Sequence, residues 1–256
     1  MRERLQYITA DDGTRIECAV IEHDHPHATT TTSRAASTTA SARDWFVLAH
    51  AHPKLGGSRE MMTPLARALG RKGYGSVSIA LRGTSGSLGY SSWRGSPEEG
   101  ADIVAGARLA RQCLGATSDA RVHLIGYSYG STICSYALDG DESIASLIAI
   151  GYPRGSYSCG FMGIGAKILM RDSFDALKAS RKPKLFIHPE NDDFTSKSTM
   201  ERLVNTKLFD EDDDDGRVKP FLKILPGAGH FSVVNELRCV EDAAAIIVDF
   251  VEKLEL

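Results

Sequence analysis

The sequence predicts an α/β fold with a mostly parallel central sheet and helices on both of its faces. Short continuous runs of apolar residues recur along the chain, and stretches with helical character lie between them. Such runs are typical of parallel strands, which are buried on both faces and connected by helices. The length of 256 residues, with 42% hydrophobic and 25% charged residues, suits a single domain over 1–256.

The N-terminal part is expected to differ from the rest. Two alternating runs within residues 5–22 flank Asp11-Asp12-Gly13, and Asp-Gly between such runs is typical of a β-hairpin. Residues 23–43 combine histidines with a Thr/Ser/Ala-rich tract that has no apolar periodicity, which predicts a flexible, low-complexity surface loop. The histidines at 23, 25 and 27 are a weak candidate for a metal site, because ligands on a mobile loop lack supporting groups.

From residue 45 onward, predicted strands and helices alternate. Further strands are predicted at 45–49, 76–80, 121–125, 147–150, 185–188 and 221–225. Helices are predicted at about 61–72, 97–114, 130–138 and from 233 to the end. Gly73 is expected to end the first of these helices, and Pro97 to begin the second. The acidic tract at 211–215 is expected to be a solvated loop, since its spacing does not match a calcium-binding loop.

Charge and composition narrow the function classes. The net charge of −3 gives no electrostatic reason to expect a nucleic-acid partner. No apolar run approaches the roughly 18 residues of a membrane span. The first residues lack the apolar stretch of a signal peptide, so a cytoplasmic location is expected. The five cysteines are scattered and odd in number, which argues against a disulfide framework or a structural zinc site. Nothing in the sequence indicates the oligomeric state.

The most specific motif is Gly-Tyr-Ser-Tyr-Gly at 126–130, which fits G-x-S-x-G. It follows an apolar strand and precedes a helical stretch, the context in which this motif forms a nucleophile elbow. A serine on such a turn takes strained backbone angles, and the glycines leave room for the neighbouring backbone. The turn lifts the hydroxyl to a helix N-terminus, where developing negative charge is stabilised. Ser128 is therefore the candidate nucleophile.

A serine hydroxyl needs a base within hydrogen-bond reach to act as a nucleophile. Among the eight histidines, His230 lies in a glycine-containing loop after the last strand, at the sheet edge that carries Ser128. His230 is the candidate general base. The acid that orients it should follow an earlier strand, and the loop after the fifth of these strands offers Glu190, Asp192 and Asp193. The register of the loop favours Asp192 as the catalytic acid, with Asp193 as its main rival.

A tetrahedral intermediate also needs backbone donors that form an oxyanion hole. The N–H of Tyr129, directly after the nucleophile, is one candidate. The other is the N–H of His52, in the loop after the first buried strand, because Pro53 has no N–H to offer. His50 and His52 resemble a metal-binding pair, but no third ligand is evident in the sequence. We expect their rings to form hydrogen bonds that order the loop.

These motifs resemble those of the α/β-hydrolase superfamily along nearly the whole chain. The loop His-Ala-His-Pro-Lys-Leu-Gly-Gly at 50–57 (H-x-H-P-x-x-G-G) is similar to the H-P-H-P-x-x-G-G loop of a group of small serine hydrolases, although Ala51 stands where many relatives have glycine or proline. Arg-Gly-Thr-Ser-Gly-Ser at 82–87 resembles the R-G-x-G-x-S segment of that group, with one residue more. Asp-Asp-Phe-Thr-Ser at 192–196 resembles its D-x-F-T-S acid loop, and this match supports Asp192.

The resemblance implies an α/β-hydrolase fold and a serine esterase or thioesterase that cleaves a small to medium acyl substrate through an acyl-serine intermediate, without metal or organic cofactor. In the superfamily that this chain resembles, a lid commonly follows the fourth of the six strands predicted from residue 45 onward. Here that interval, about 151–182, is short, which predicts a small or absent lid and a cleft lined partly by Phe161, Met162 and Ile164. A simple crossover connection is the alternative. A serine peptidase or amidase, and a non-catalytic ligand-binding or complex-subunit protein that keeps the fold, also remain open.

Overall fold

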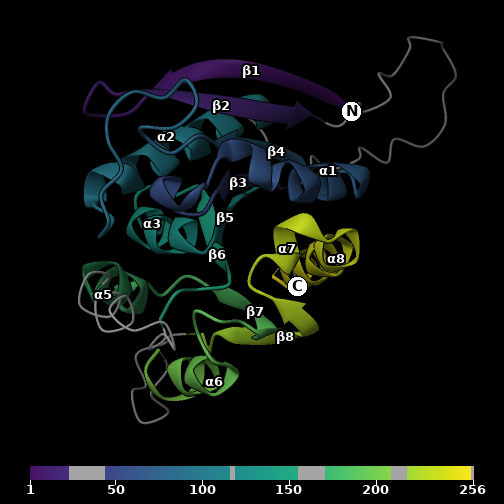
Figure 1. Cartoon of the computed structure of the whole chain (residues 1–256). Coiled ribbons are helices and arrows are strands. Elements are labelled where there is room, and N and C mark those ends of the chain that lie inside the picture. Colours follow the sequence, from purple (N-terminus) through teal and green to yellow (C-terminus); the bar gives the residue numbers. More distant parts are fainter. Residues whose placement is uncertain (23–43, 116–118, 155–170, 209–217, 255–256) are drawn as a thin grey trace, which may run out of the picture.

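The centre of the molecule is an eight-stranded sheet, which Figure 1 shows crossing the molecule from β1 to β8. A computed structural model of the chain describes residues 1–22, 44–115, 119–154, 171–208 and 218–254. The strands lie in the order β1-β2-β4-β3-β5-β6-β7-β8. Their bounds are β1 (Arg2–Thr9), β2 (Arg15–Glu22), β3 (Trp45–Ala49), β4 (Gly75–Ile79), β5 (Val122–Tyr127), β6 (Ile144–Ile150), β7 (Lys184–Asn191) and β8 (Phe221–Gly229).

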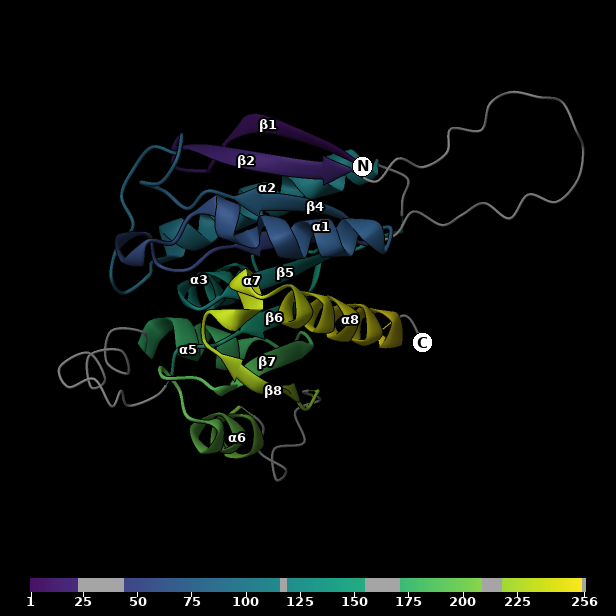
Figure 2. The same ribbon diagram turned by 45° about the vertical axis from the view of Figure 1, so that its right-hand side comes forward.

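The strands from β4 to β8 in this order pair in parallel, whereas β2 pairs antiparallel with both β1 and β4. The helices are α1 (Thr63–Arg71), α2 (Pro97–Leu114), α3 (Tyr129–Ala137), α5 (Arg171–Ala179), α6 (Lys197–Thr206), α7 (Ser232–Asn235) and α8 (Leu237–Lys253). Two 3₁₀ turns, η1 (Pro53–Leu55) and η2 (Arg59–Met62), precede α1. The helices cover both faces of the sheet, and α7 and α8 lie next to α1 (Figure 2).

Two apolar cores lie on the two faces of the sheet, because successive strand residues point to opposite sides. In β3, Val47 packs in the core that contains apolar residues of α2, α3, α5 and α6. Its neighbours Phe46 and Leu48 pack in the core that contains apolar residues of α1, α7 and α8. All three side chains are fully buried. The continuous apolar run of β3 therefore reflects a strand covered by helices on both faces.

The predicted fold class is confirmed, and so is the N-terminal hairpin, in which β1 and β2 pair over their whole length. Most other elements differ from the predicted bounds by one to three residues, and two differences are larger. Strand β8 continues to Gly229, because its pairing with β7 resumes after a register shift and joins Asn191 to Gly229. The last predicted helix is two helices, since Glu236 between α7 and α8 has extended backbone angles. The predicted loop at 23–43 and the acidic tract at 211–215 lie outside the described residues.

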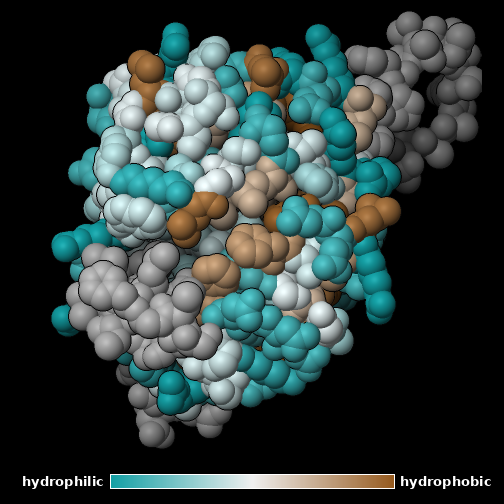
Figure 3. Space-filling model, in the orientation of Figure 1, coloured by the Kyte–Doolittle hydropathy of each residue, from teal (hydrophilic) through white to brown (hydrophobic). Residues whose placement is uncertain are grey.

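The surface is mixed in character. Figure 3 shows hydrophilic side chains around the margin of one face and a group of more apolar side chains near its centre. Large exposed aromatic side chains include Tyr90, Trp93 and Phe231, the last of which directly follows His230 in the sequence. None of the helices within the described ranges combines the length and the apolar character that crossing a lipid bilayer requires.

Candidate active site

Strand β5 ends in a tight turn that carries Ser128. The backbone of Ser128 has φ 53° and ψ −120°, a conformation that costs a residue other than glycine about 1–3 kcal/mol. A Cβ on Gly126 would lie 2.2 Å from the backbone of the first turn of α3, and a Cβ on Gly130 would lie 2.3 Å from the carbonyl oxygen of Ala49. Only glycine fits at both positions. The N–H of Ser128 donates to the carbonyl oxygen of Ile150 at 2.8 Å, which ties the strained turn to the sheet.

Three side chains that follow different strands form a continuous chain of hydrogen bonds. Nε2 of His230, which follows β8, lies 3.1 Å from Oγ of Ser128. Nδ1 of the same ring lies 2.8 Å from Oδ2 of Asp192, which follows β7. Because an ionised carboxylate only accepts, Nδ1 carries the proton, and the lone pair of Nε2 faces the serine hydroxyl. His230 is 3% exposed and Asp192 is 8% exposed, so little water competes for these bonds.

Asp192, the first of the two aspartates after β7, is the one hydrogen-bonded to His230. Oδ1 of Asp192 accepts hydrogen bonds from the N–H groups of Phe194 (2.7 Å) and Thr195 (3.1 Å), which directs Oδ2 toward His230. The ring of Phe194 also packs against the imidazole, with 4.2 Å between ring centroids. The rival Asp193 is exposed. The loop thus fixes one carboxylate beside the imidazole and leaves the other in solvent.

Two further residues hold His230, and the sequence analysis did not identify them. Oη of Tyr127 donates to the carbonyl oxygen of His230 at 3.0 Å. Burial raises the pKa of Tyr127, so the phenol keeps the proton that it donates. Gly151 has φ 57°, and a Cβ there would lie 3.1 Å from Cε1 of His230. Any side chain at residue 151 would therefore press on the imidazole. Gly151 could have been recognised in the sequence, because it directly follows the predicted strand at 147–150, at the sheet edge that carries Ser128.

The two candidate oxyanion donors come from backbone segments that touch. Tyr129 is the first residue of α3, and neither its N–H nor that of His52 donates a hydrogen bond to any residue that the structure describes. Gly130 leaves room for the end of β3 and the loop after it. In that loop a Cβ on Gly57 would lie 2.0 Å from the carbonyl oxygen of Ala51, so glycine permits its tight fold. Within the described ranges, both amides therefore lack an acceptor.

The ring of His52 forms hydrogen bonds that order its loop, as expected, although the sequence did not indicate its partners Ser92 and Trp93. Its Nδ1 accepts from the N–H of Lys54 at 3.1 Å, so Nε2 carries the hydrogen that it donates to the carbonyl oxygen of Ser92 at 3.1 Å. Burial lowers the pKa of His52, and the neutral ring stacks on Trp93 with 4.3 Å between centroids. Oη of Tyr129 donates to the same carbonyl oxygen at 2.7 Å. Ser92 therefore connects the two residues whose amides are candidate donors.

The rings of His50 and His52 make separate contacts. Nδ1 of His50 donates to the carbonyl oxygen of Ala51 at 2.7 Å, and Nε2 accepts from the N–H of Leu81 at 3.0 Å. Burial lowers the pKa of His50 to about 4, so this ring is neutral in the folded protein near neutral pH. The bond from Leu81 connects the loop after β3 to the segment after β4, and Oγ1 of Thr84 in that segment lies 3.3 Å from the same Nε2.

The residues expected to line the cleft, Phe161, Met162 and Ile164, lie outside the described residues. The same is true of residues 155–170, which make up half of the predicted lid-like insertion at 151–182. Their predicted role in binding substrate therefore stays a prediction.

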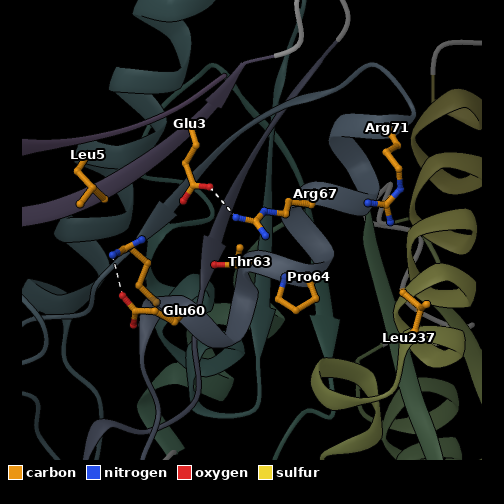
Figure 4. A pocket seen from close by; sticks show the side chains of 9 residues that line it. Glu3, Leu5, Glu60, Thr63, Pro64, Arg67, Arg71 and Leu237 are labelled. Carbon is orange, nitrogen blue, oxygen red and sulfur yellow. Dashed lines mark hydrogen bonds and ion pairs between the residues drawn. The ribbon is translucent and has the colours of Figure 1, made fainter. Parts of the chain in front are cut away.

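A pocket of about 580 Å³ contains none of the residues above (Figure 4). It lies beside β1, α1 and the start of α8 and is lined by Glu3, Leu5, Arg59, Glu60, Thr63, Pro64, Arg67, Arg71 and Leu237. Its positive charges have partners: Arg67 pairs with Glu3 at 3.1 Å, and Arg59 pairs with Glu60 at 2.7 Å. Arg71 pairs with an acidic residue of α8. Each of these arginines therefore has an acidic partner, and none of the side chains that line the pocket is placed to act as an activated nucleophile.

Comparisons with known proteins place the fold. A family model described as the α/β hydrolase fold matches residues 44–158. A search of curated protein sequences gave no match. Among solved structures, the chain is similar to a lidless α/β serine hydrolase from Xanthomonas campestris, with a TM-score of 0.69 and 19% identity over 99% of this chain and 95% of that one.

Two esterases show the same likeness. One is an esterase from Pyrococcus furiosus, with a TM-score of 0.72 and 16% identity over 98% of this chain and 91% of that one. The other is an esterase from Exiguobacterium antarcticum, with a TM-score of 0.63 and 16% identity over 96% of this chain and 99% of that one. At these identities the likeness establishes the arrangement of the backbone and not the reaction.

Proposed function

We propose that this chain, which has the α/β-hydrolase fold, is a serine hydrolase that cleaves a small to medium carboxylic ester or thioester through an acyl-serine intermediate. The observation that carries the proposal is the hydrogen-bonded chain from Ser128 through His230 to Asp192. The strained turn and the start of α3 give that serine a setting suited to attack on a carbonyl group.

In the proposed first step, Oγ of Ser128 attacks the carbonyl carbon of the substrate while Nε2 of His230 takes the hydroxyl proton. The carbonyl π electrons move to the oxygen, which becomes an oxyanion. The N–H groups of Tyr129 and His52 donate hydrogen bonds to it, each lowering the barrier by about 3 kcal/mol. Asp192 holds the imidazole in the required tautomer and stabilises the imidazolium that forms.

The intermediate then collapses. The bond to the leaving alkoxide or thiolate breaks, and the proton on Nε2 of His230 passes to the leaving group. An acyl ester on Ser128 remains. A water molecule repeats the sequence: His230 takes its proton, the hydroxide adds to the acyl carbon, and the same proton returns to Oγ as the acid leaves.

The preference for esters rests on two supports. The H-x-H-P-x-x-G-G loop at 50–57 resembles that of small serine hydrolases, and two structural neighbours are esterases. Turnover of p-nitrophenyl acyl esters of varied chain length, compared with aminoacyl anilides, tests this preference. We expect ester cleavage, fastest with short to medium acyl chains. Cleavage of anilides alone would identify a peptidase or amidase instead.

A fluorophosphonate probe tests the activated serine itself. We expect the wild-type protein to be labelled and Ser128→Ala to be unlabelled, because the probe needs a nucleophile with a base beside it. Ser146→Ala is the matched control, since Ser146 also bonds a histidine but is fully buried. An unlabelled wild type would instead favour a binding protein that keeps the fold without turnover.

A further inference from the structure

Glu99 is a buried acid that the proposed mechanism does not use. It lies in the first turn of α2 and is 1% exposed. Its hydrogen-bond partners are neutral groups of two other segments. Oε1 lies 2.8 Å from Oη of Tyr129, and Oε2 lies 3.1 Å from Oγ of Ser92 and 3.4 Å from the backbone nitrogen of that residue. Burying a carboxyl group costs free energy unless its hydrogen bonds are made, so Glu99 needs these contacts.

The direction of this side chain departs from the usual arrangement at the start of a helix. Ser96 is the N-cap of α2, and its Oγ accepts from the N–H of Glu99 at 3.3 Å. A glutamate three residues after such a serine commonly bonds back to the N–H of the N-cap residue, which completes a capping box. Here the carboxyl group is directed to Ser92 and Tyr129 instead. Helix capping therefore does not explain where Glu99 points.

The carbonyl oxygen of Ser92 joins the two residues whose amides are the candidate oxyanion donors. It lies 3.1 Å from Nε2 of His52 and 2.7 Å from Oη of Tyr129. The ring of His52 is also fixed at its other nitrogen, by the N–H of Lys54. The same ring packs against the ring of Tyr129, with 4.4 Å between centroids. The side chains of both candidate donor residues therefore meet at one carbonyl group.

Glu99 restrains both parts of this contact. Its Oε2 contacts the hydroxyl group and the backbone nitrogen of Ser92, so the residue that carries the shared carbonyl group is held in place. Its Oε1 contacts the phenol of Tyr129, whose single hydrogen is shared between a carboxyl oxygen and a carbonyl oxygen. Burial and the nearby Glu99 raise the pKa of Tyr129, so the phenol keeps this hydrogen. One carboxyl group thus fixes Ser92 and Tyr129 together.

The positions of the two amides are expected to affect the reaction strongly. An oxyanion donor acts at about 2.7–3.1 Å from the developing charge, and a misplacement of about 1 Å can lower a rate by about 100-fold. Tyr129 begins α3, whereas His52 precedes the 3₁₀ turn η1, so no single segment fixes the spacing of their amides. The contacts through Ser92 and Glu99 connect the two segments.

We propose that Glu99 is a positioning residue for the oxyanion hole. Through Ser92 it fixes the ring of His52, and through the phenol it fixes Tyr129. The proposal rests on the function proposed above, because an oxyanion forms only if the chain attacks a carbonyl group. Glu99 itself touches no substrate. Because the two amides bind most strongly to the charge that develops in the transition state, Glu99 acts on kcat and leaves KM nearly unchanged.

The first test compares variants in steady-state hydrolysis of a p-nitrophenyl ester. Glu99→Leu has a similar size but no hydrogen-bonding group, and we expect kcat to fall by about 10- to 100-fold with KM within about twofold. Glu99→Gln should keep kcat within about threefold, because its amide can donate to the phenol and accept from Ser92. Glu98→Leu is the matched control, since Glu98 lies in the same turn of α2 but is exposed, and its kcat should equal that of the wild type.

The pH profile separates positioning of the amides from an effect on the base. Thermal unfolding first checks that each variant is folded. If Glu99→Leu is not, Tyr129→Phe replaces it, because it removes the contacts with Glu99 and Ser92 and keeps the backbone N–H. The apparent pKa in the profile of kcat/KM should equal that of the wild type, since His230 is unchanged. A folded variant with kcat within about twofold of the wild type, or with a shifted profile, would overturn the proposal.

Nitrogen-15 NMR of the His52 ring needs no turnover and so separates this proposal from the proposed function. In the wild type we expect the hydrogen on Nε2 to exchange slowly with water, because the carbonyl oxygen of Ser92 accepts it. Glu99→Leu should speed this exchange by at least about tenfold. Unchanged exchange would overturn the positioning role. Faster exchange in a chain that hydrolyses neither esters nor thioesters would contradict the proposed function and leave the arrangement of the amides by Glu99 standing.

Discussion

Strand β5 has a Ser–His–Asp arrangement at each of its ends. At its C-terminal end, His230 joins Ser128 (3.1 Å) to Asp192 (2.8 Å). At its N-terminal end, His123 joins two other side chains by its two ring nitrogens. Nδ1 lies 2.7 Å from Oγ of Ser146, and Nε2 lies 2.8 Å from Oδ2 of Asp44. The two arrangements have nearly the same distances and use the ring nitrogens in opposite senses.

Their surroundings differ. Ser146 lies within β6, pairs with His123 across the sheet and is fully buried. Ser128 lies beyond the end of its strand, has a strained backbone and begins a helix. Asp44 also accepts three hydrogen bonds from Arg121, at 2.5–3.2 Å, which makes this end of the sheet an ion-paired support. Burial raises the pKa of Asp44, but hydrogen bonds from His123 and Arg121 outweigh that effect and lower it.

The comparison shows that the distances within a Ser–His–Asp chain do not by themselves indicate a nucleophile. A reacting serine must also be reached by substrate and lie beside donors for an oxyanion. The N-terminal ends of parallel strands offer neither, whereas the C-terminal ends are where open α/β sheets bind ligands. We therefore expect the first arrangement to govern activity and the second to govern stability.

Removing each histidine gives the largest expected contrast. His230→Ala should lower kcat for a p-nitrophenyl ester by roughly 10⁴- to 10⁶-fold, since the serine loses its base. His123→Ala should change kcat little but lower the free energy of unfolding by about 3–5 kcal/mol, because it leaves Asp44 buried beside an unfilled space. Steady-state kinetics and urea unfolding measure the two effects. A folded His123→Ala protein as inactive as His230→Ala would contradict the assignment of roles.

The two adjacent aspartates after β7 provide the next contrast. Asp192→Asn should lower kcat by about 10³- to 10⁴-fold, because an amide cannot hold the imidazole in the required tautomer. Asp193→Asn should leave kcat within about twofold, since this side chain is exposed. Both are measured with the same ester. Equal losses in the two variants would mean that the second aspartate also serves the histidine.

His50 is a third buried histidine, and unlike His123 and His230 its ring bonds no carboxylate within the described residues. Its pKa is lowered by burial from 6.5 to about 4, so the unfolded chain takes up the proton first as pH falls. Above pH 6.5 the neutral ring contributes up to about 3 kcal/mol to the free energy of unfolding. This contribution is lost as the pH falls to about 4. Asp44 loses its contribution only below its ordinary pKa of 3.8.

Urea unfolding of the wild type and His50→Gln between about pH 4 and pH 7 measures this effect. The variant is expected to be less stable at neutral pH, where it lacks the neutral imidazole. Its stability should also fall less on acidification. Parallel curves for the two proteins would show that His50 does not titrate as its burial implies.

Ser146→Ala carries the smallest expected effect. It removes one buried hydrogen bond to His123, which should lower the free energy of unfolding by about 1 kcal/mol. The activity of the folded protein should stay within about twofold of the wild type. Denaturant unfolding and ester turnover check the two expectations, and a tenfold loss of activity would show that the N-terminal arrangement is coupled to the reaction.

Local physical requirements made much of the fold and of the candidate site visible in the sequence. Buried parallel strands need continuous apolar runs, so β3 was predicted with its observed bounds, and helix α2 was predicted over 97–114. The turn at Ser128 needs glycines on both sides of its sharp bend, so it left a five-residue motif. The loops that carry Asp192 and His230 could be assigned to one sheet edge from strand order alone.

What only the tertiary structure decided depends on partners that are distant in the sequence. His123 meets Asp44 across 79 residues, and His52 meets Ser92 across 40 residues, because the sheet brings their strands and loops together. Arg154 lines one small hollow together with Arg202 of α6 and with Lys207, which follows that helix, although more than forty residues separate it from them in the sequence. A motif can be recognised in the sequence when the backbone conformation of one short segment requires particular residue types. Contacts between ordinary side chains follow from strand order and packing, which no single segment determines.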